Sequence, residues 1–294
     1  MNARIIDGKK IAEEIQGEIR AEVSKLKQEG IAPGLAVVLV GDNPASQVYV
    51  KNKSIACEKA GIHSETLRLP GTTKEDELLA LIDKLNVDRK FNGILVQLPL
   101  PKHINEGRVL ERIKPEKDVD GFHPVNIGRL VQGEETFLPC TPAGIQQLLV
   151  RSGAEIAHKH VVVVGRSNIV GKPIANILLQ KKEGANATVT ICHTGTKDMS
   201  VYTKQADILV VAAGKAEVIT GDMMKEGVVV IDVGINRIED PATKKSRLVG
   251  DVHFASASQK ASMISPVPGG VGPMTVTMLL KNTVKAAKLQ GKGT

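Results

Sequence analysis

Hydrophobic residues recur along this chain in two alternating patterns. Between residues 11 and 26, isoleucine, valine and leucine return every three or four positions, which predicts an amphipathic helix that ends at Gly30. A continuous apolar run at 35–40 follows, and the turn residues 41–44 end it. Such a valine-rich run is typical of a buried parallel strand. Alternating strands and helices predict an α/β fold with a parallel sheet covered by helices.

The alternation continues to the end of the chain. We predict helices at 45–60, 73–85 and 106–113, with strands at 65–69 and 93–98. A second series has a helix from Thr141, strands at 161–164, 188–192, 208–212 and 228–233, and a final helix at 274–289. Residues 114–140 are polar, turn-rich and aperiodic, so we interpret them as the crossing between two domains.

Composition narrows the functional classes. The chain has 294 residues, 42% of them hydrophobic, which suits a globular protein with a large core. No apolar run approaches the roughly 18 residues that a membrane helix needs, and the first residues lack the pattern of a signal peptide. Cys57, Cys140 and Cys192 form no CxxC motif, which suits a reducing compartment. We therefore expect a cytoplasmic protein that does not bind a membrane.

The charge balance favours small anionic ligands over nucleic acids. The net charge is +7, but the basic residues are dispersed and aromatic residues make up only 2% of the chain. Single-strand binders use aromatic side chains as stacking platforms. We therefore predict no nucleic-acid partner, and phosphates or carboxylates are the better expected ligands.

The segment VVVVGRSNIVGKPIANILL predicts a strand, a tight turn and a helix. Gly165 follows the strand directly, and Gly171 lies six residues later. Glycines in this position let backbone N–H groups approach a pyrophosphate at the positive end of a helix. The spacing differs from the usual GxGxxG, so a turn that needs its glycines only for packing stays an alternative.

Two details of this segment favour NADP over NAD. Arg166 stands where a cation could reach a phosphate, and the following strand ends in Cys192-His193-Thr194. An NAD enzyme usually places an acidic residue near that point to bind the ribose 2′-hydroxyl. The missing acid, with Arg166 and Thr194, indicates a 2′-phosphate.

A second group of candidate residues lies in the N-terminal half. Tyr49 and Lys53 are four residues apart and share one helix face, after a strand whose carboxyl end is where α/β sheets bind ligands. A lysine in a partly desolvated cleft can act as an acid or base, although a solvated lysine is the common alternative. Gln97 ends another strand. Asp118 and Asp120 supply acids in a loop without the spacing of a calcium site, so we predict no metal.

The glycine-rich loop 266–273 contains too many glycines for a helix cap alone. Its sequence PVPGGVGP suggests backbone that closely lines a ligand.

Together these stretches closely resemble the bifunctional methylenetetrahydrofolate dehydrogenase/cyclohydrolase family. The resemblance extends from residue 40 to residue 280. It is carried by VGDNPASQVYVKNKSIACEKAGI, GILVQLPLP, KDVDGFHPVNIGRL, PCTPAGI, VVGRSNIVGKPIANILL, VIDVGIN and PVPGGVGPMTVTMLL.

The resemblance implies two reactions of one-carbon metabolism. The first oxidises 5,10-methylenetetrahydrofolate to the methenyl cation with NADP, and the second hydrolyses that cation to 10-formyltetrahydrofolate. Lys53 would be the acid/base of hydrolysis, tuned by Gln97, while Tyr49 would stack on the aminobenzoate ring and Asp120 would bind the pterin. The resemblance also assigns NADP to Gly165, Arg166, Ser167, Thr194 and Ile235, and the lining of the folate site to Gly269, Gly270 and Pro273.

The family likeness also implies an architecture. We expect a folate-binding catalytic domain of residues 1–140 plus the helix 274–294, and a Rossmann-type NADP-binding domain of residues 141–273, with a cleft between them. We expect a homodimer formed through the cofactor domains, acting on tetrahydrofolate derivatives, polyglutamylated forms included. A dehydrogenase without hydrolase activity and a non-catalytic NADP-binding protein remain alternatives.

Overall fold

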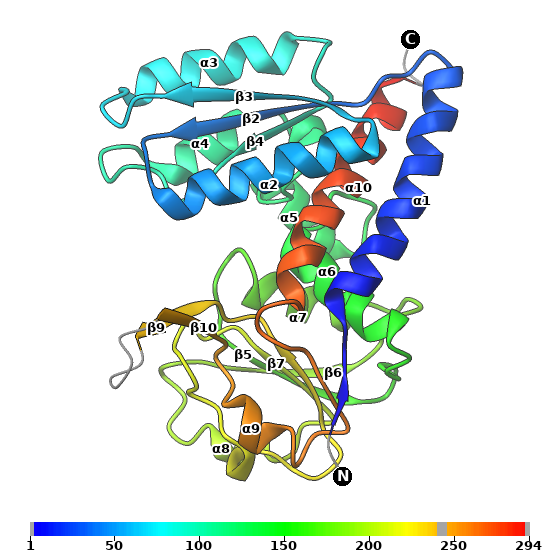
Figure 1. The fold of residues 1–294 in the computed structure, drawn as a ribbon, viewed down its shortest axis with the longest axis vertical. Coiled ribbons are helices and arrows are strands. Elements are labelled where there is room, and N and C mark those ends of the chain that lie inside the picture. The colour runs from blue at the N-terminus through cyan, green and yellow to red at the C-terminus, as the bar shows by residue number, and fades with distance from the viewer. Residues whose placement is uncertain (1–2, 240–245, 292–294) are drawn as a thin grey trace. The chain divides into compact units, whose positions relative to one another are not determined.

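The computed structural model describes residues 3–239 and 246–291, which divide into two compact units (Figure 1). The first, which we call the three-stranded unit, consists of residues 13–140 and 276–291. The second, the six-stranded unit, consists of residues 3–12, 141–239 and 246–275. Neither unit is one continuous piece of the chain.

The three-stranded unit is built on a parallel sheet with the order β3-β2-β4. The strands are β2 (Gly34–Val40), β3 (His63–Leu69) and β4 (Gly93–Val96). Its helical segments are α2 (Pro44–Ala60), α3 (Glu75–Val87), α4 (Glu106–Arg112), the 3-10 turn η1 (Pro115–Lys117) and α5 (Pro124–Gln132). Helices α1 (Gly8–Gln28) and α10 (Val271–Gly291) have residues in both units.

Strand β2 is the centre of this unit because every one of its residues is buried. Alternate residues of a strand face opposite sides of the sheet. Ala36, Val38 and Val40 pack against Leu78 of α3 and Val109 of α4. Helix α2 lies on the other face of the sheet from α3 (Figure 1). A strand covered on both faces reads as a continuous apolar run, which is why this strand was predictable.

The six-stranded unit has an all-parallel sheet with the order β1-β11-β8-β7-β5-β6. The strands are β1 (Arg4–Ile5), β5 (His160–Val164), β6 (Thr188–Cys192), β7 (Ile208–Val211), β8 (Val229–Asp232) and β11 (Met263–Ile264). An antiparallel pair, β9 (Asn236–Glu239) with β10 (Ser246–Val249), lies outside this sheet. The helical segments are α6 (Cys140–Arg151), α7 (Gly171–Leu178), α8 (Ser200–Thr203), the 3-10 turn η2 (Gly221–Met223) and α9 (Phe254–Ala257).

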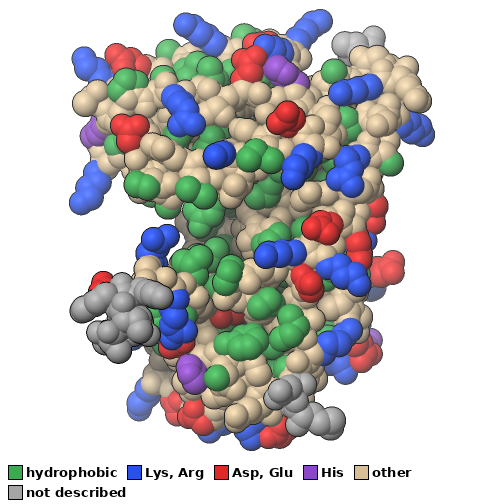
Figure 2. Space-filling model, in the orientation of Figure 1, with side chains coloured by type: hydrophobic (Ala, Val, Ile, Leu, Met, Phe, Trp, Pro, Cys, Tyr) green, Lys and Arg blue, Asp and Glu red, His purple; other side chains and the backbone are tan. Residues whose placement is uncertain are grey.

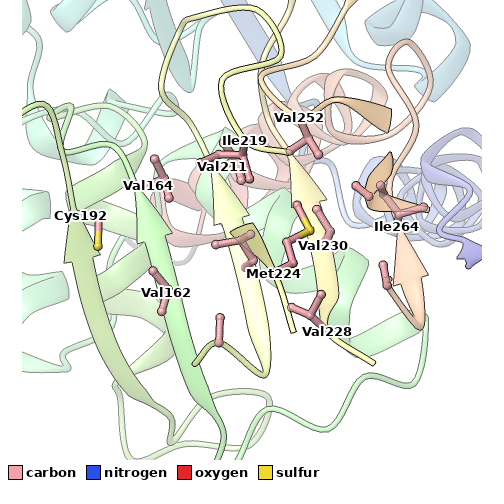
Figure 3. Close-up of a cluster of buried hydrophobic side chains, with 14 residues drawn as sticks. Val162, Val164, Cys192, Val211, Ile219, Met224, Val228, Val230, Val252 and Ile264 are labelled. Carbon is pink, nitrogen blue, oxygen red and sulfur yellow. The ribbon is translucent and has the colours of Figure 1, made fainter. Parts of the chain in front are cut away.

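One face of this sheet carries a continuous apolar core (Figure 3). Val162 and Val164 of β5, with Val211 of β7, point toward Ile219 and Val252 from the segments that cover the face. Burial of these side chains stabilises the unit by roughly 1.5–3 kcal/mol for each fully buried residue. The core therefore fixes β5, whose carboxyl end leads into the glycine-containing turn 165–171.

The predicted α/β architecture with parallel sheets is confirmed, and the predicted strand 188–192 coincides with β6. Three features differ from the sequence prediction. Helix α5 lies within the stretch 114–140 that we interpreted as aperiodic, because it has only nine residues between the turn-forming Pro124 and Gly133 and buries only Asn126 and Leu130. Residues 3–12 belong to the six-stranded unit, although we expected them in the first domain, because β1 pairs with β11. Strands β9, β10 and β11 were not predicted because they are short or polar.

None of the described helices combines the length and apolar character that a membrane span requires. On the face shown in Figure 2, basic and acidic side chains are interspersed in each unit.

Candidate active site

Helix α2 carries Tyr49 and Lys53 and begins directly after the turn that follows β2. The Asn43 side chain accepts hydrogen bonds from the backbone N–H groups of Ala45 (3.0 Å) and Ser46 (3.1 Å). An asparagine in this position satisfies the first free N–H groups of a helix and is worth about 1 kcal/mol. This cap fixes the start of α2 and therefore the register that places Tyr49 and Lys53 on one face.

Lys53 and Gln97 are in direct contact. The Lys53 Nζ donates to Gln97 Oε1 at 2.9 Å, while Gln97 Nε2 donates to the Leu98 carbonyl at 2.7 Å. Lys53 is only 8% exposed, whereas Tyr49, one turn earlier, is 44% exposed. The ammonium group is thus enclosed and held, and the tyrosine ring remains open to a ligand.

The loop after η1 is organised by Asp118, a buried carboxylate. Its oxygens accept from the backbone N–H groups of Gly121 (3.1 Å), Phe122 (3.2 Å) and His123 (2.8 Å), and from the Asn126 amide (2.8 Å). All four bonds serve the shape of the loop, so Asp118 has no capacity left for a ligand. The acid available for chemistry in this loop is Asp120.

Asp120 interacts with the positive charge of Lys53 and with the thiol of Cys140. Burial raises the pKa of Asp120, while the positive charge of Lys53 and a hydrogen bond from the Cys140 thiol oppose that rise. The Asn282 side chain of α10 donates to the carbonyls of Val119 and Leu138, both at 2.9 Å. The same amide therefore ties Val119, which directly precedes Asp120, to Leu138 in the segment that leads into α6.

The turn between β5 and α7, residues 165–171, is tight, as its glycines suggest; we call it the cofactor turn. A Cβ atom at Gly165, whose φ is +123°, would lie 2.1 Å from the carbonyl oxygen of Ala212. A Cβ at Gly171 would lie 2.2 Å from the Gly165 oxygen. Any side chain at either glycine would clash with a backbone carbonyl, so both positions require glycine. The backbone of the turn is therefore not covered by side chains at these positions.

This turn has free donors of the kind that hold a pyrophosphate. Residues 166–169 are exposed, and their backbone N–H groups donate to no acceptor within the described chain. Ser167 Oγ accepts from the N–H groups of Val170 (3.1 Å) and Gly171 (3.3 Å), which fixes the start of α7. Exposed N–H groups at a helix N-terminus suit phosphate oxygens, so these residues fit a dinucleotide.

Arg166 and His193 meet at the edge of the turn. Arg166 Nη1 lies 3.4 Å from His193 Nε2, and His193 Nδ1 accepts from the Gly195 N–H at 3.0 Å. Because Nδ1 is an acceptor, the ring proton lies on Nε2, so two donors face each other. An anion would satisfy both. Thr194, also exposed, follows directly.

The remaining predicted residues also lie in the six-stranded unit. Ile235 is 50% exposed after β8. In the loop before α10, Gly269 has φ +109°, and a Cβ at Gly270 would meet the Pro266 oxygen at 2.7 Å. Pro273 stands in the first turn of α10. This loop presents backbone, as the glycine count suggested.

The structure therefore groups the predicted residues by unit. Tyr49, Lys53, Gln97 and Asp120 belong to the three-stranded unit, and the eight other predicted site residues belong to the six-stranded unit. In the range 3–239 and 246–291, no three His, Cys, Asp or Glu side chains are arranged to hold a metal ion.

Comparison with known proteins places the chain in a family. Residues 6–120 match the tetrahydrofolate dehydrogenase/cyclohydrolase catalytic domain, and residues 139–291 match the NAD(P)-binding domain of the same family. The chain belongs to the tetrahydrofolate dehydrogenase/cyclohydrolase family. The family predicted from the sequence is thus confirmed.

Individual relatives cover almost the whole chain. It is 62% identical to the bifunctional protein FolD of Moorella thermoacetica, across 98% of this chain and all of that protein. The crystal structure of the bifunctional FolD enzyme of Campylobacter jejuni superposes with a TM-score of 0.93, at 52% identity, covering 98% of this chain and 99% of that one. The Trypanosoma brucei enzyme, crystallised with NADP cofactor and inhibitor, has a TM-score of 0.93 at 40% identity, covering 99% of both chains.

Three residues of functional interest carry no clear signal in the sequence. His193 was noted only as part of a strand end, and its orientation depends on a turn that no motif marks. Asp232 and Asp251 are buried acids whose partners are mostly backbone N–H groups, which carry no sequence signal. Asp232 lies within VIDVGIN, one of the stretches that carry the family resemblance, and nothing else in the sequence distinguishes it.

Proposed function

We propose that this chain carries out both reactions of its family, with Lys53 as the acid/base of hydrolysis. The enzyme oxidises 5,10-methylenetetrahydrofolate with NADP and then hydrolyses the methenyl product to 10-formyltetrahydrofolate. The observation that carries the proposal is the enclosed Lys53 ammonium held by Gln97, one turn from the exposed Tyr49 ring and near Asp120.

The oxidation requires positioning more than chemical groups. NADP, when bound, accepts the hydride that leaves the methylene carbon. The protein has to hold two rings at reacting distance, which alone can contribute about 7–11 kcal/mol. Tyr49 supplies a stacking surface for the folate, and the carboxyl group of Asp120 can accept from the N–H groups of the pterin. The free N–H groups of 166–169 hold the pyrophosphate.

The hydrolysis requires one proton carrier. Lys53 carries one proton from the water that attacks the methenyl carbon to the ring nitrogen that is released when its bond to that carbon breaks. The second proton, on the hydroxyl of the adduct, leaves to solvent as the formyl C=O forms, so the hydrolysis of the cation releases one H+. A positioned acid/base typically contributes about 10² to 10⁴ in rate. Gln97 keeps the Nζ atom in one place because its own amide is fixed by Leu98.

The selection of NADP over NAD is assigned to the edge of the cofactor turn. Arg166 and His193 present two converging donors, and Thr194 can add a third. A 2′-phosphate has the acceptors and the charge to satisfy them, whereas a 2′-hydroxyl has neither the charge nor enough acceptors. The preference for NADP therefore rests on these three side chains.

The proposal includes a homodimer formed through the six-stranded unit. Strand β6 is one edge of its sheet, and its Ile191 side chain is exposed. Val201 and Tyr202 of α8, the next element along the chain, are exposed as well. Exposed apolar strand edges are usually covered, and a second copy of the chain would cover this one. We place the enzyme in the cytoplasm, supported by three free cysteines.

One experiment tests both activities together. The absorbance of the methenyl intermediate is followed after mixing the protein with 5,10-methylenetetrahydrofolate and NADP. We expect a rise followed by decay to 10-formyltetrahydrofolate. A rise without decay would leave only the dehydrogenase, and no rise with intact NADP binding would reduce the protein to a nucleotide-binding module.

A further inference from the structure

Two buried carboxylates lie at the carboxyl ends of β7 and β8. Asp232 is 4% exposed and Asp251 is completely buried, and no Lys or Arg of the described residues forms an ion pair with either. The oxygens of Asp232 accept instead from the backbone N–H groups of Gly234 (3.0 Å), Asp251 (2.9 Å) and Val252 (3.0 Å). Buried charges persist only when such bonds satisfy them.

Asp251 bridges two separate loops. Its Oδ2 accepts from the N–H groups of Ala213 (2.7 Å) and Gly214 (2.8 Å), in the loop after β7. Its Oδ1 accepts from the Asn236 side-chain amide (2.8 Å), at the start of β9. Each oxygen thus serves one loop, and the loops are held at a fixed separation.

The space for both carboxylates is built into the backbone. A Cβ atom at Gly234 would lie 2.2 Å from Asp251 Oδ1, and one at Gly250 would lie 1.7 Å from Asp232 Oδ2. Neither Gly234 nor Gly250 has a left-handed φ, so the backbone conformation alone does not require glycine there. Glycine is required because the two carboxylates approach these positions too closely for a side chain.

Ile235 lies between the two tethered residues. Gly234 before it is bound to Asp232, and Asn236 after it is bound to Asp251, while the Ile235 side chain itself is half-exposed. The loop that Asp251 holds continues from Ala212, whose carbonyl packs against the cofactor turn. The carboxylate pair is thus linked to both sides of the nucleotide site.

We propose that Asp232 and Asp251 are positioning residues that hold Ile235 and the 213–214 backbone in the conformation that binds the dinucleotide. The inference rests on the proposed contact between Ile235 and NADP. Without the tethers, only part of the population presents the binding conformation. The apparent dissociation constant rises in inverse proportion to that part, so occupancy of one tenth weakens binding about tenfold.

The test compares tether variants by calorimetric titration with NADP and by hydrolysis of the methenyl substrate, which needs no nicotinamide. Asn236→Ala removes the tether next to Ile235 without opening a buried site. We expect it to weaken NADP binding about tenfold, with hydrolysis within twofold of the unmodified enzyme. Gln146→Ala is the matched control, because it also removes a part-buried side-chain amide bond in this unit, to the Gly184 carbonyl, and should change neither readout.

Asp251→Ala and Asp251→Asn form a second pair. The alanine variant loses both loops and should weaken NADP binding more than Asn236→Ala. The asparagine variant keeps an oxygen for the 213–214 N–H groups, and its amide can donate to Asn236 once that side chain turns over, so it should recover most of the affinity. If Asp251→Ala does not fold, Asn236→Ala decides the matter alone.

Two results would overturn the inference. One is an Asn236→Ala protein that binds NADP as tightly as the unmodified enzyme. The other is an equal loss of NADP binding and hydrolysis, which would show that the tethers serve folding in general. A failure of the function proposed for Ile235 is recognised separately, because an Ile235→Ala protein would then keep its NADP affinity while the tether variants lose theirs.

Discussion

Lys53 donates to Gln97 through a 2.9 Å hydrogen bond, and the Gln97 amide can be oriented in only one way. Its Nε2 is engaged with the carbonyl of Leu98, so its oxygen has to face Lys53. The ammonium group is therefore held by an acceptor that cannot turn over to become a donor. The Lys53 side chain is therefore held in one position and is not free to move in solvent.

Replacement of this lysine should separate the two activities. Lys53→Met keeps the length of the side chain and removes its proton carrier, so we expect hydrolysis to fall by about 10² to 10⁴, with dehydrogenase activity still measurable. Both rates are measured on the same preparation. Lys51→Met, on an exposed position of the same helix, is the control. An equal loss of both activities would show that Lys53 acts through positioning or folding.

Loss of the loop acid should affect the folate and spare the nucleotide. Asp120→Ala removes a hydrogen-bonding carboxyl group, worth about 1.5–3 kcal/mol when charged, so the folate KM should rise roughly 10- to 100-fold. NADP affinity, measured by titration without folate, should stay unchanged. Asp76→Ala changes an exposed acid of α3 and serves as the control. A change confined to the NADP affinity would mean that Asp120 is misassigned.

Arg166 should govern the choice between NADP and NAD. We expect Arg166→Ala to raise the KM for NADP by about tenfold or more, since a charged hydrogen bond to phosphate is lost. The KM for NAD, which lacks that phosphate, should change little. Steady-state rates with both cofactors give the ratio directly. If both constants rise together, Arg166 binds the shared pyrophosphate and does not select NADP.

Asp232 should make stability depend on pH. Burial raises the pKa of Asp232 to about 6, against an ordinary value of 3.8. The protonated form is thus favoured in the folded protein, and the stabilisation it gives below pH 3.8 is lost as pH rises through 6. Each pKa unit corresponds to about 1.4 kcal/mol, so the loss is about 3 kcal/mol.

Asp232→Asn cannot titrate and isolates this effect. The difference in unfolding free energy between the unmodified protein and the variant, from urea denaturation at several pH values, should fall by about 3 kcal/mol between pH 3 and 7. Taking the difference cancels the other titrating groups. A flat difference would show that the carboxyl group keeps one charge state throughout.

The edge of the larger sheet offers a test of assembly. Ile191→Lys places a charge on exposed strand β6, and we expect it to shift the protein from dimer to monomer in sedimentation velocity. Val87→Lys charges an exposed apolar position in the other unit and should leave the dimer intact. A dimer in the Ile191→Lys protein would move the interface elsewhere.

The sequence predicted most of this fold because its central strands are buried on both faces. Runs such as 35–40 and 161–164 consist of apolar residues without interruption, and only a covered parallel strand tolerates that. Strand β1, with two residues, has no such signal, and its place became visible only through its pairing with β11. Short strands and the hairpin β9–β10 depend on partners that are distant in sequence.

The site followed the same division. Lys53 and Gln97 could be expected to approach each other because they follow β2 and β4, which are neighbours in the sheet. The approach of the Arg166 and His193 donors could not be expected from the sequence. The orientation of the His193 ring depends on which of its nitrogens accepts from the Gly195 N–H. The roles assigned to these residues remain predictions, whereas the family and its two activities follow from the whole chain.

The division of each unit into two segments has a consequence for how the protein is made. Asn282, which ties Val119 beside Asp120 to Leu138, belongs to a segment that follows the entire six-stranded unit in the chain. A ribosome therefore synthesises the lysine, the glutamine and the acid long before the helix that completes their surroundings. Domains usually fold one after another as they emerge. Here the loop that contains Asp120 can reach its final structure only after α10 has been synthesised. An interrupted translation product therefore contains the catalytic residues but lacks the helix that completes their site.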